Sequence, residues 1–229
     1  NLDTDTAEEI VIGNSYYDRT MYVYDYQGSN IWNKVTIEYV GEDNHDVKIA
    51  DVDNDGQNEI VAGFGVWSPY SVRIYKYNAG AYQKIWSYSF TSVSPYGPVY
   101  YLDTGDINND GKNEILVTEW WNGGEANAND IFVFEHGGGV TWNLSWSKNF
   151  PGNGCKFPYI GRIKNSGVNE FAFLNDDIIY VYKWTGSDYA VVGSAGGWTN
   201  ISIITGGDTD NDGAHETIIG RQNIVYIKD

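Results

Sequence analysis

One short acidic sequence recurs along this chain, and the recurrence restricts the fold more than any other feature. Its three full copies occupy residues 51–59 (DVDNDGQNE), 106–114 (DINNDGKNE) and 208–216 (DTDNDGAHE). A weaker copy occupies residues 1–9 (NLDTDTAEE), and a decayed copy occupies residues 162–170 (RIKNSGVNE). Successive copies start about 46 to 56 residues apart, which is the length of a four-stranded β unit and not of a helical repeat.

The segments between the acidic copies have the pattern of β-strands. An alternating motif of aromatic and β-branched residues returns once per unit and runs into a turn rich in Gly, Asn and Ser; it covers residues 23–26 (VYDY), 74–77 (IYKY), 133–136 (VFEH) and 181–184 (VYKW). Alternation bounded by such turns predicts a strand that enters a hairpin. No stretch keeps a 3.6-residue period, so we expect almost no helix.

Each unit therefore divides into a strand before the acidic loop, a strand after it, the alternating motif, and a last strand rich in Trp and Tyr. By this count the first unit lacks the leading strand and the last unit lacks the final one. We predict an all-β fold, a β-propeller of four-stranded antiparallel blades, with five blades of which the two terminal ones are incomplete, in a single domain over residues 1–229. A fragment of a larger ring is the alternative, because the chain starts at Asn1 inside a repeat unit and we expect an upstream segment to have been removed.

The acidic loops have the oxygen-rich composition of a calcium site. Calcium takes several oxygen ligands at once, and carboxylates packed this closely would repel one another without a cation. We expect side-chain oxygens from positions one, three, five and nine and a backbone carbonyl from position seven. The predicted ligands are Asp51, Asp53, Asp55, Gln57 and Glu59, then Asp106, Asn108, Asp110, Lys112 and Glu114, then Asp208, Asp210, Asp212, Ala214 and Glu216.

The two imperfect copies predict different behaviour. The first has Thr6 in place of the turn glycine, so we expect weaker binding or none there. Its candidate ligands are Asn1, Asp3, Asp5 and Glu9. The fourth has Arg, Lys and Ser at three ligand positions and should bind no metal. We therefore expect about three Ca²⁺ ions and a fourth, weaker site.

An EF-hand and a magnesium site both suit the loops less well than a calcium site closed at position nine. An EF-hand needs a Glu at position twelve and flanking helices, whereas position twelve here is Ala62, Val117 or Ile219. Magnesium is less favoured because it retains water and takes few protein ligands. Plain polar turns are the remaining alternative, since Asp, Asn and Gly favour turns, but three copies in the same register argue against it.

The loops resemble the FG-GAP/VCBS-type calcium repeats of integrin α-subunit propellers and of secreted adhesin-like and lectin-like propellers. The resemblance extends through all five registers, and in that family the loop links the first two strands of a blade. It implies a calcium-stabilised extracellular module for adhesion or ligand binding.

Aromatic residues gather in Gly-rich loops that we expect on the face opposite the calcium loops. Rigid rings with polar handles are favoured at recognition surfaces. Packing between units is the alternative for each of them. The candidate ligand-binding residues are Tyr16, Tyr17, Trp67, Tyr70, Tyr96, Trp120, Trp121 and Trp198.

The net charge of the chain restricts the classes of partner that it can bind. The net charge is −17, from 31 acidic and 14 basic residues, which argues against nucleic acid because phosphate binding needs clustered Lys and Arg. No apolar run approaches the ~20 residues of a membrane span. We expect a carbohydrate or protein ligand, and possible self-assembly through the incomplete terminal blades.

We expect a binding module rather than an enzyme, because most acidic residues are assigned to metal and the three histidines lie in different units. Two alternatives stay open: a calcium-dependent polysaccharide lyase or hydrolase, whose acids could include Asp46, Asp103 and Glu119, and a structural subunit of a surface layer or filament. Cys155 is the only cysteine, and we expect it to be buried and inert. Two N-glycosylation sequons, at Asn143 and Asn200, agree with an extracellular, secreted location.

Overall fold

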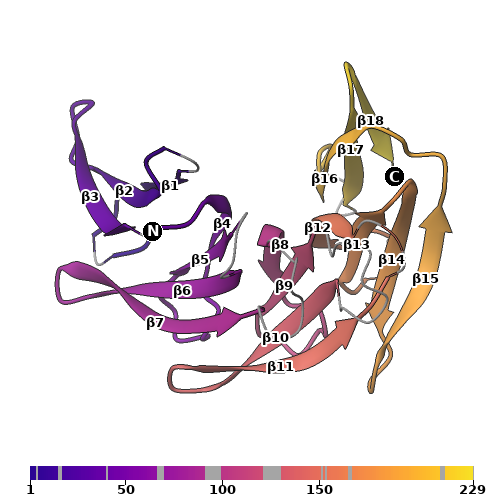
Figure 1. Ribbon diagram of the computed structural model, residues 1–229, viewed down its shortest axis with the longest axis horizontal. Helices are drawn as coiled ribbons and strands as arrows, with labels where there is room; N and C mark the ends of the chain where they lie inside the picture. The colour runs from indigo at the N-terminus through magenta and orange to yellow at the C-terminus, as the bar shows by residue number, and fades with distance from the viewer. Residues whose placement is uncertain are drawn as a thin grey trace.

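The computed structural model describes residues 1–229 except 4, 15–16, 40, 66–69, 91–98, 121–129, 151, 153, 165–166, 212–214 and 229. The described residues form eighteen β-strands and no α-helix. These strands make five antiparallel sheets, which follow one another in chain order along an open arc (Figure 1). Within the described ranges, no helix is long and apolar enough to cross a bilayer.

Each sheet is a simple meander in which neighbours in sequence are neighbours in space. The first sheet contains β1 (Glu9–Gly13), β2 (Thr20–Tyr26) and β3 (Trp32–Tyr39). The second contains β4 (Asn44–Ala50), β5 (Glu59–Phe64), β6 (Ser71–Asn78) and β7 (Ala81–Ser89). The third contains β8 (Val99–Gly105), β9 (Glu114–Glu119), β10 (Ile131–Gly138) and β11 (Thr141–Lys148). The fourth contains β12 (Cys155–Gly161), β13 (Glu170–Asn175), β14 (Ile178–Trp184) and β15 (Tyr189–Ala195), and the fifth β16 (Ile201–Gly207), β17 (Glu216–Arg221) and β18 (Ile224–Lys228).

The strand content of each unit agrees with the expectation from the sequence. The first sheet lacks the strand before the acidic loop, and the fifth lacks the last strand. In the second to fifth units the loop joins the first two strands, in the first unit it leads into β1, and in the first four units the alternating motif forms the strand that follows. The all-β, antiparallel character is therefore confirmed. Strands β4, β8, β12 and β16 lie side by side along the inside of the arc (Figure 1). Among the described strands, no sheet combines strands from the two ends of the chain.

The hydrophobic core lies between successive sheets rather than within one of them. The second strand of each complete unit, β5, β9 or β13, is buried along its whole length, which explains why these segments are nearly continuous apolar runs instead of alternating ones. One cluster, for example, packs Val61 and Ile74 of the second sheet against Phe132 and Phe134 of the third. Equivalent clusters fill the other three spaces between sheets. Each sheet therefore depends on its neighbours for burial.

A ladder of asparagine hydrogen bonds joins successive acidic loops. The asparagine at position eight of one loop donates from Nδ2 to the backbone carbonyl at position one of the preceding loop: Asn58 to Asn1 at 2.9 Å, Asn113 to Asp51 at 2.9 Å, and Asn169 to Asp106 at 2.7 Å. The fifth loop has His215 at this position, and its Nδ1 lies 3.3 Å from the Tyr159 hydroxyl instead. The loops are thus connected to one another as well as to their own sheets.

We predict that Asn113→Ala lowers the free energy of unfolding by about 1 to 2 kcal/mol, because it leaves a partly buried carbonyl without its donor. In a chain of this length each kcal/mol lowers Tm by roughly 2 to 4 °C. Urea denaturation followed by tryptophan fluorescence measures the change. Asn33→Ala, at an exposed position of β3, is the control and should have little effect. Equal stability of the two variants would contradict a structural role for the ladder.

Candidate functional site

The acidic loops are shaped by their own side chains. In the second loop, Asp51 accepts from the backbone N–H groups of Asp55 (3.1 Å) and Gly56 (2.9 Å), and Asp53 accepts from Asp55 at 3.2 Å. The third loop repeats these contacts with the equivalent residues. Asn54 and Gly56 adopt positive φ values of 61° and 95°, a conformation that Asn and Gly tolerate best. The consensus sequence therefore specifies one compact loop geometry.

The glutamate at position nine closes each loop from the first residue of the following strand. Its Oε2 accepts from the backbone N–H at position two: Glu59 from Val52 at 3.0 Å, and Glu114 from Ile107 at 2.8 Å. Glu9 accepts from Leu2 in the same way. These glutamates are buried, so the closing charge of each loop lies in a region of low dielectric constant.

Carboxylates converge at the same place in four of the five units. In each group one oxygen per residue lies within 4.8 Å of the others. The groups are Asp51, Asp53 and Glu59; Asp106, Asp110 and Glu114; Asp208, Asp210 and Glu216; and Asp3, Asp5, Glu9 and Asp25. No acidic group of this kind is found among the described residues of the fourth loop. The units whose sequences predict acidic sites are therefore the ones in which acids meet.

Other predicted ligands have different placements. Asp55 lies outside the carboxylate group of its loop and is ion-paired with a lysine. Asn108 Nδ2 lies 3.3 Å from Glu114 Oε1, so its amide touches the closing acid. The Asn1 amide donates to backbone carbonyls of its own loop. The backbone N–H groups of Gln57 and Lys112 complete the turns, donating to Asp55 and Asp110 respectively. Asp212 and Ala214 lie outside the described residues.

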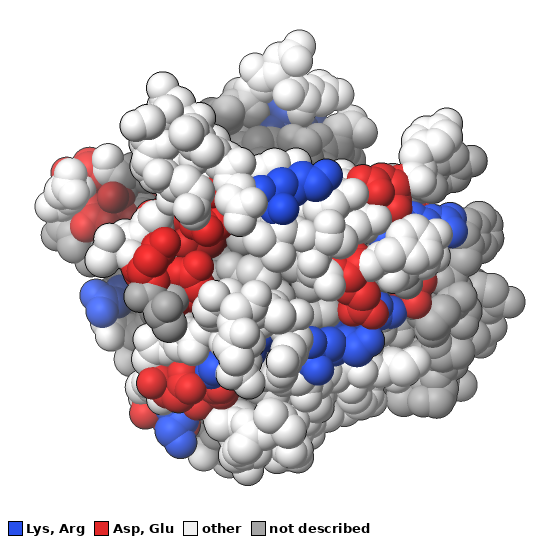
Figure 2. All heavy atoms as spheres, turned by 90° about the vertical axis from the view of Figure 1, so that its left-hand side faces the viewer, with Lys and Arg blue, Asp and Glu red and all other residues white. Residues whose placement is uncertain are grey.

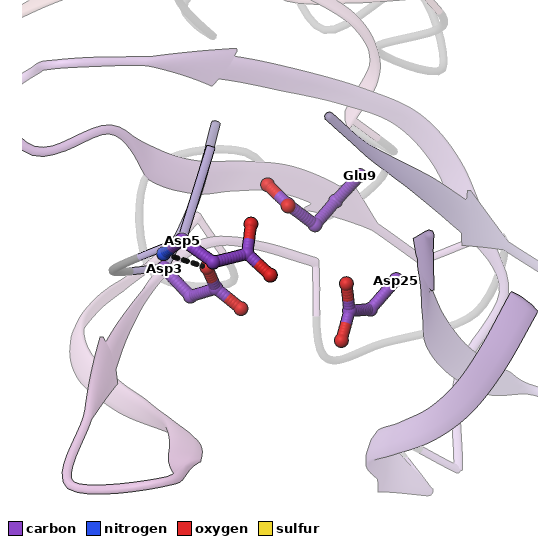
Figure 3. A group of neighbouring side chains, drawn as sticks. All are labelled: Asp3, Asp5, Glu9 and Asp25. Atoms are coloured by element: carbon purple, nitrogen blue, oxygen red, sulfur yellow. Dashed lines mark hydrogen bonds between the residues drawn. The ribbon is translucent and has the colours of Figure 1, made fainter. Parts of the chain in front are cut away.

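Two charged residues next to the loops were missed by the sequence analysis. Asp25 on β2 joins the first acidic group, where Figure 3 shows its carboxylate facing those of Asp3, Asp5 and Glu9. Lys76 on β6 occupies the matching position in the second unit. Its Nζ lies 2.7 Å from Asp53 Oδ2 and 2.8 Å from Asp55 Oδ2. The same Nζ lies 2.7 Å from Glu59 Oε1, an ion pair rather than an aligned hydrogen bond. The signal was present in the sequence, since both are the third residue of the alternating motif.

Burial and mutual repulsion perturb the closing acids. Burial, followed by nearby Asp110 and Asp106, raises the pKa of Glu114 to about 8, although two backbone N–H groups oppose the shift. The pKa of Glu9 is raised for the same reasons. Lys76 differs from them: burial acts to lower its pKa, but its contacts with three carboxylates outweigh burial and raise it. The loops therefore favour a positive charge at their centres.

The four predicted aromatic residues that the structure describes differ widely in their exposure to solvent. Tyr17 is 93% exposed, whereas Tyr70 is 6% exposed and packs in the core between the second and third sheets. Trp198 is half-buried and meets the Tyr226 ring edge-on, with centroids 5.5 Å apart. Trp120 is 37% exposed. The remaining four predicted residues, Tyr16, Trp67, Tyr96 and Trp121, lie outside the described residues.

Trp120 belongs to a row of rings that we call the aromatic row: His45, Tyr100 and Trp120, with Lys156 beside them. His45 stacks on Tyr100 with centroids 3.9 Å apart, and Tyr100 meets Trp120 edge-on at 4.7 Å. Lys156 Nζ lies 5.1 Å from the centroid of the Trp120 ring. Because Val99 pairs with Glu119 at one end of the third sheet and Gly105 with Glu114 at the other, the row lies at the end opposite the acidic loop.

A pocket of about 420 Å³ opens among the innermost strands β4, β8, β12 and β16. Its polar lining includes His45, Asp46, Lys48 and Asp103. Asp46 accepts from the backbone N–H of Leu102 at 2.9 Å, so its carboxylate joins two sheets. Asp103 does the same with the N–H of the β12 residue Ile160 at 2.8 Å. Burial is the main cause that raises the pKa of both acids.

The pocket contains two of the three acids that the sequence suggested for catalysis. The structure brings Asp46 and Asp103 to one pocket, while Glu119 is fully buried at the end of β9 and does not line it. Burial lowers the pKa of His45, so this ring is neutral near pH 7, and its Nε2 is buried without a hydrogen-bond partner. A neutral imidazole is competent to accept a proton.

Acidic side chains gather in separate patches on the side of the molecule nearest the first sheet, with Lys and Arg side chains between them (Figure 2). The acidic residues visible on this side therefore form local clusters. Such clusters attract cations at short range.

Comparisons with known proteins support the repeat and the fold. A family model for the FG-GAP-like repeat matches residues 51–117, which contain the second and third acidic loops. No curated protein sequence matches the chain.

The solved structures similar to this chain include three rhamnogalacturonan lyases. The Bacillus licheniformis rhamnogalacturonan lyase PL11 is 12% identical, with a TM-score of 0.51 over 88% of this chain and 49% of that one. Rhamnogalacturonan lyase YesW is also 12% identical, with a TM-score of 0.53 over 88% of this chain and 49% of that one. The exotype rhamnogalacturonan lyase YesX is 12% identical, with a TM-score of 0.52 over 88% of this chain and 47% of that one. This chain thus spans about half the length of these lyases and shares their fold over that part.

We predict that calcium binding weakens below pH 8. A metal ion must displace the proton from Glu114, whose pKa is about 8 without metal, so the affinity of that site should fall about tenfold per pH unit below this value. Stability without metal should change in the opposite direction. The folded state keeps this proton between about pH 4.5 and 8 while the unfolded state has lost it, so the free energy of unfolding should fall as pH rises through that window.

Calorimetric calcium titrations between pH 6 and pH 9 test the first effect, and urea denaturation in chelator over the same range tests the second. Glu114→Gln keeps the hydrogen-bond acceptor without the ionisation and is the control, with a flatter pH profile in both. An identical pH profile for Glu114→Gln and wild type would refute the role of this carboxyl.

Proposed function

We propose that this chain is a calcium-stabilised β-propeller module that acts outside the cell and binds carbohydrate or protein without catalysing a reaction. The observation that carries the proposal is the return of one carboxylate group at the same place in four units. Carboxylates this close repel one another, so their return at equivalent positions of separate sheets favours a bound cation at each position. The five sheets serve as the blades of one domain, of which the first and last are incomplete.

Calcium suits these groups better than other common cations. The grouped residues are all Asp and Glu, with no histidine or cysteine among them, which favours a hard ion over zinc or copper. Several protein oxygens converge on each centre, as calcium accepts and magnesium resists. The FG-GAP-like match over residues 51–117 agrees with this choice. The resemblance of the loops to those of VCBS-type and integrin α-subunit propellers supports a role in adhesion or ligand recognition.

The aromatic row is the ligand-binding surface that we favour. It lies at the end of the sheets opposite the calcium loops, and its Trp120 ring is partly exposed beside the Lys156 ammonium. A flat ring with a neighbouring charged group suits the faces of sugars and also the side chains of a protein. Tyr17 adds a second exposed ring in the first unit.

The terminal sheets provide contacts for self-assembly. The first sheet exposes Ile10 (49%) and Ile12 (40%), and the fifth exposes Ile224 (55%), Val225 (65%) and Ile227 (58%). In the three complete units the strand equivalent to β1 is buried along its whole length. Apolar surface of this kind is covered in functional assemblies, and the unpaired edges of the two sheets can extend across copies.

A second candidate, a polysaccharide lyase, is favoured by the pocket. In this candidate, neutral His45 accepts the proton next to a sugar carboxylate while Lys48, whose Nζ lies 3.4 Å from Asp103 Oδ1, neutralises that carboxylate. The bond from carbon to the glycosidic oxygen breaks as the carbon–carbon double bond forms, and the proton on His45 passes to the leaving oxygen. The shared fold with rhamnogalacturonan lyases is compatible with this alternative. Both pocket acids are, however, engaged in holding sheets together.

Calcium should stabilise the folded chain. Each independent site adds about 2.7 kcal/mol when free calcium exceeds its Kd by about 100-fold. We predict that excess chelator lowers Tm markedly compared with calcium buffer, and that the dialysed protein retains calcium when its metal content is measured by atomic emission. Equal melting in chelator and calcium, with no bound metal, would refute the proposal.

We predict that Trp120→Ala weakens binding to a responsive polysaccharide by about tenfold, the scale of one lost aromatic contact. Trp32→Ala, which removes a Trp of similar exposure (43%) on β3, should have no effect. A panel of neutral and acidic soluble polysaccharides, incubated with the protein in calcium, is assayed for binding and for ultraviolet absorbance of new double bonds. Intact bound polymer supports the binding module; cleavage that disappears in His45→Ala supports the lyase.

A further inference from the structure

In the first four units one strand position faces the closing glutamate, and its charge changes from unit to unit. In the first sheet Glu9 pairs with Asp25 across β1 and β2. The pairs Ile60–Tyr75 and Ile115–Phe134 place Lys76 opposite Glu59 and Glu135 opposite Glu114 in the next two units. In the fourth unit the pair Phe171–Tyr182 places Lys183 opposite Glu170. Residues directly opposite in an antiparallel pair project from the same side of the sheet, so this residue lies beside the acidic loop.

In the second unit this residue fills the loop. The Lys76 ammonium lies 2.7 Å from Asp53 and from Glu59 and 2.8 Å from Asp55, and its side chain is only 16% exposed. Calcium would approach the same oxygens at about 2.3 to 2.6 Å. The ammonium and a divalent ion therefore compete for one space, and binding of the ion would have to move Lys76 out of its contacts with three acids.

In the first unit the same position adds a ligand instead of a competitor. Asp25 brings a fourth carboxylate to within 4.8 Å of Asp3, Asp5 and Glu9. Glu9 is 7% exposed, and its Oε1 is buried without a hydrogen-bond partner. Figure 3 shows the four carboxylates facing a common space. A buried oxygen without a donor, amid three further acids, indicates that a cation belongs there.

We propose that the strand residue facing the closing glutamate selects which loops bind a divalent cation. The first loop, with its imperfect sequence, is a calcium site completed by Asp25. The second loop, with a full consensus sequence, is neutralised internally by Lys76 and does not bind calcium in the wild-type chain. This order is the reverse of the order that the loop sequences predict. The inference rests on the proposed calcium binding and adds the residue that governs it.

The third and fourth units extend the rule. Glu135 stands opposite Glu114, outside the group formed by Asp106, Asp110 and Glu114. Because this position holds no ammonium group that could compete with a metal ion, the third loop should bind calcium. Lys183 faces a loop that has Arg162 and Lys164 where the other loops have oxygen ligands and keeps only Glu170 as an acid, so removal of this lysine should create no site. Lys183→Met is therefore a matched control for Lys76→Met, with the same substitution at the same position of a different unit.

Native mass spectrometry counts the calcium ions on wild type, Lys76→Met, Lys183→Met and Asp25→Asn, and calorimetry gives their affinities. Lys76→Met should gain one calcium ion, with an affinity at least about tenfold above any residual binding at that loop, because a nearby positive charge has been removed. Lys183→Met should gain none. Asp25→Asn should lose one ion, or bind it about tenfold more weakly.

Unfolding in excess chelator gives a readout that does not depend on metal. Without metal, Lys76→Met should lower Tm because three acids lose their counter-charge, and Asp25→Asn should raise it because one repelling charge is removed. Calcium bound to wild type, with counts and affinities unchanged in Lys76→Met and Asp25→Asn, overturns this inference alone. No calcium on wild type or on any variant overturns it together with the proposed function.

Discussion

The structure depends on a buried glutamate at the start of the second strand of each unit. One of its oxygens holds the backbone of the acidic loop, as in the contact of Glu114 with Ile107 at 2.8 Å, and thereby fixes where the loop ends and the strand begins. The same burial leaves a negative charge away from water, which is costly unless a proton, an ammonium group or a metal ion neutralises it. The environment of this buried glutamate differs from unit to unit. Lys76 neutralises Glu59, Glu114 has a pKa raised to about 8, and Glu9 keeps an oxygen without a donor.

Hydrogen bonds and core packing link the acidic loops to neighbouring loops and sheets. The asparagine ladder links the second, third and fourth loops each to the loop before it. The buried residue at position two, such as Val52 or Ile107, anchors its loop in the core between sheets. The Trp142 indole of the third sheet donates to the Val52 carbonyl at 3.1 Å. A cation that tightens one loop therefore also strengthens the contact between two sheets. This arrangement explains how a chain without a disulfide can hold sheets together that share no backbone hydrogen-bond ladder.

Much of the fold could be predicted because local sequence patterns specify the strands and their order. The period of the acidic loop, the alternating motif and the missing terminal strands predicted the strand order of every unit, since consecutive strands are joined by short hairpins and loops. The meeting of acids within a loop followed from the spacing of Asp51, Asp53 and Glu59 in the sequence. What could not be predicted depends on packing across strands and sheets. Tyr70 belongs to a Gly-rich aromatic segment, yet its ring enters the core between two sheets. Asp25 and Lys76 reach their loops only through the register of the neighbouring strand, which the loop sequence does not encode.

The most direct measurement is a crystal structure grown in calcium, with anomalous scattering used to locate the ions. The account predicts ions bound by Glu9 and Asp25 in the first loop and by Glu114 in the third, with the Lys76 ammonium still in the second. Anomalous density in no acidic loop would contradict calcium binding as the basis of the module. An ion in the second loop with Lys76 displaced, and none in the first, would contradict the selection of sites by the facing strand residue.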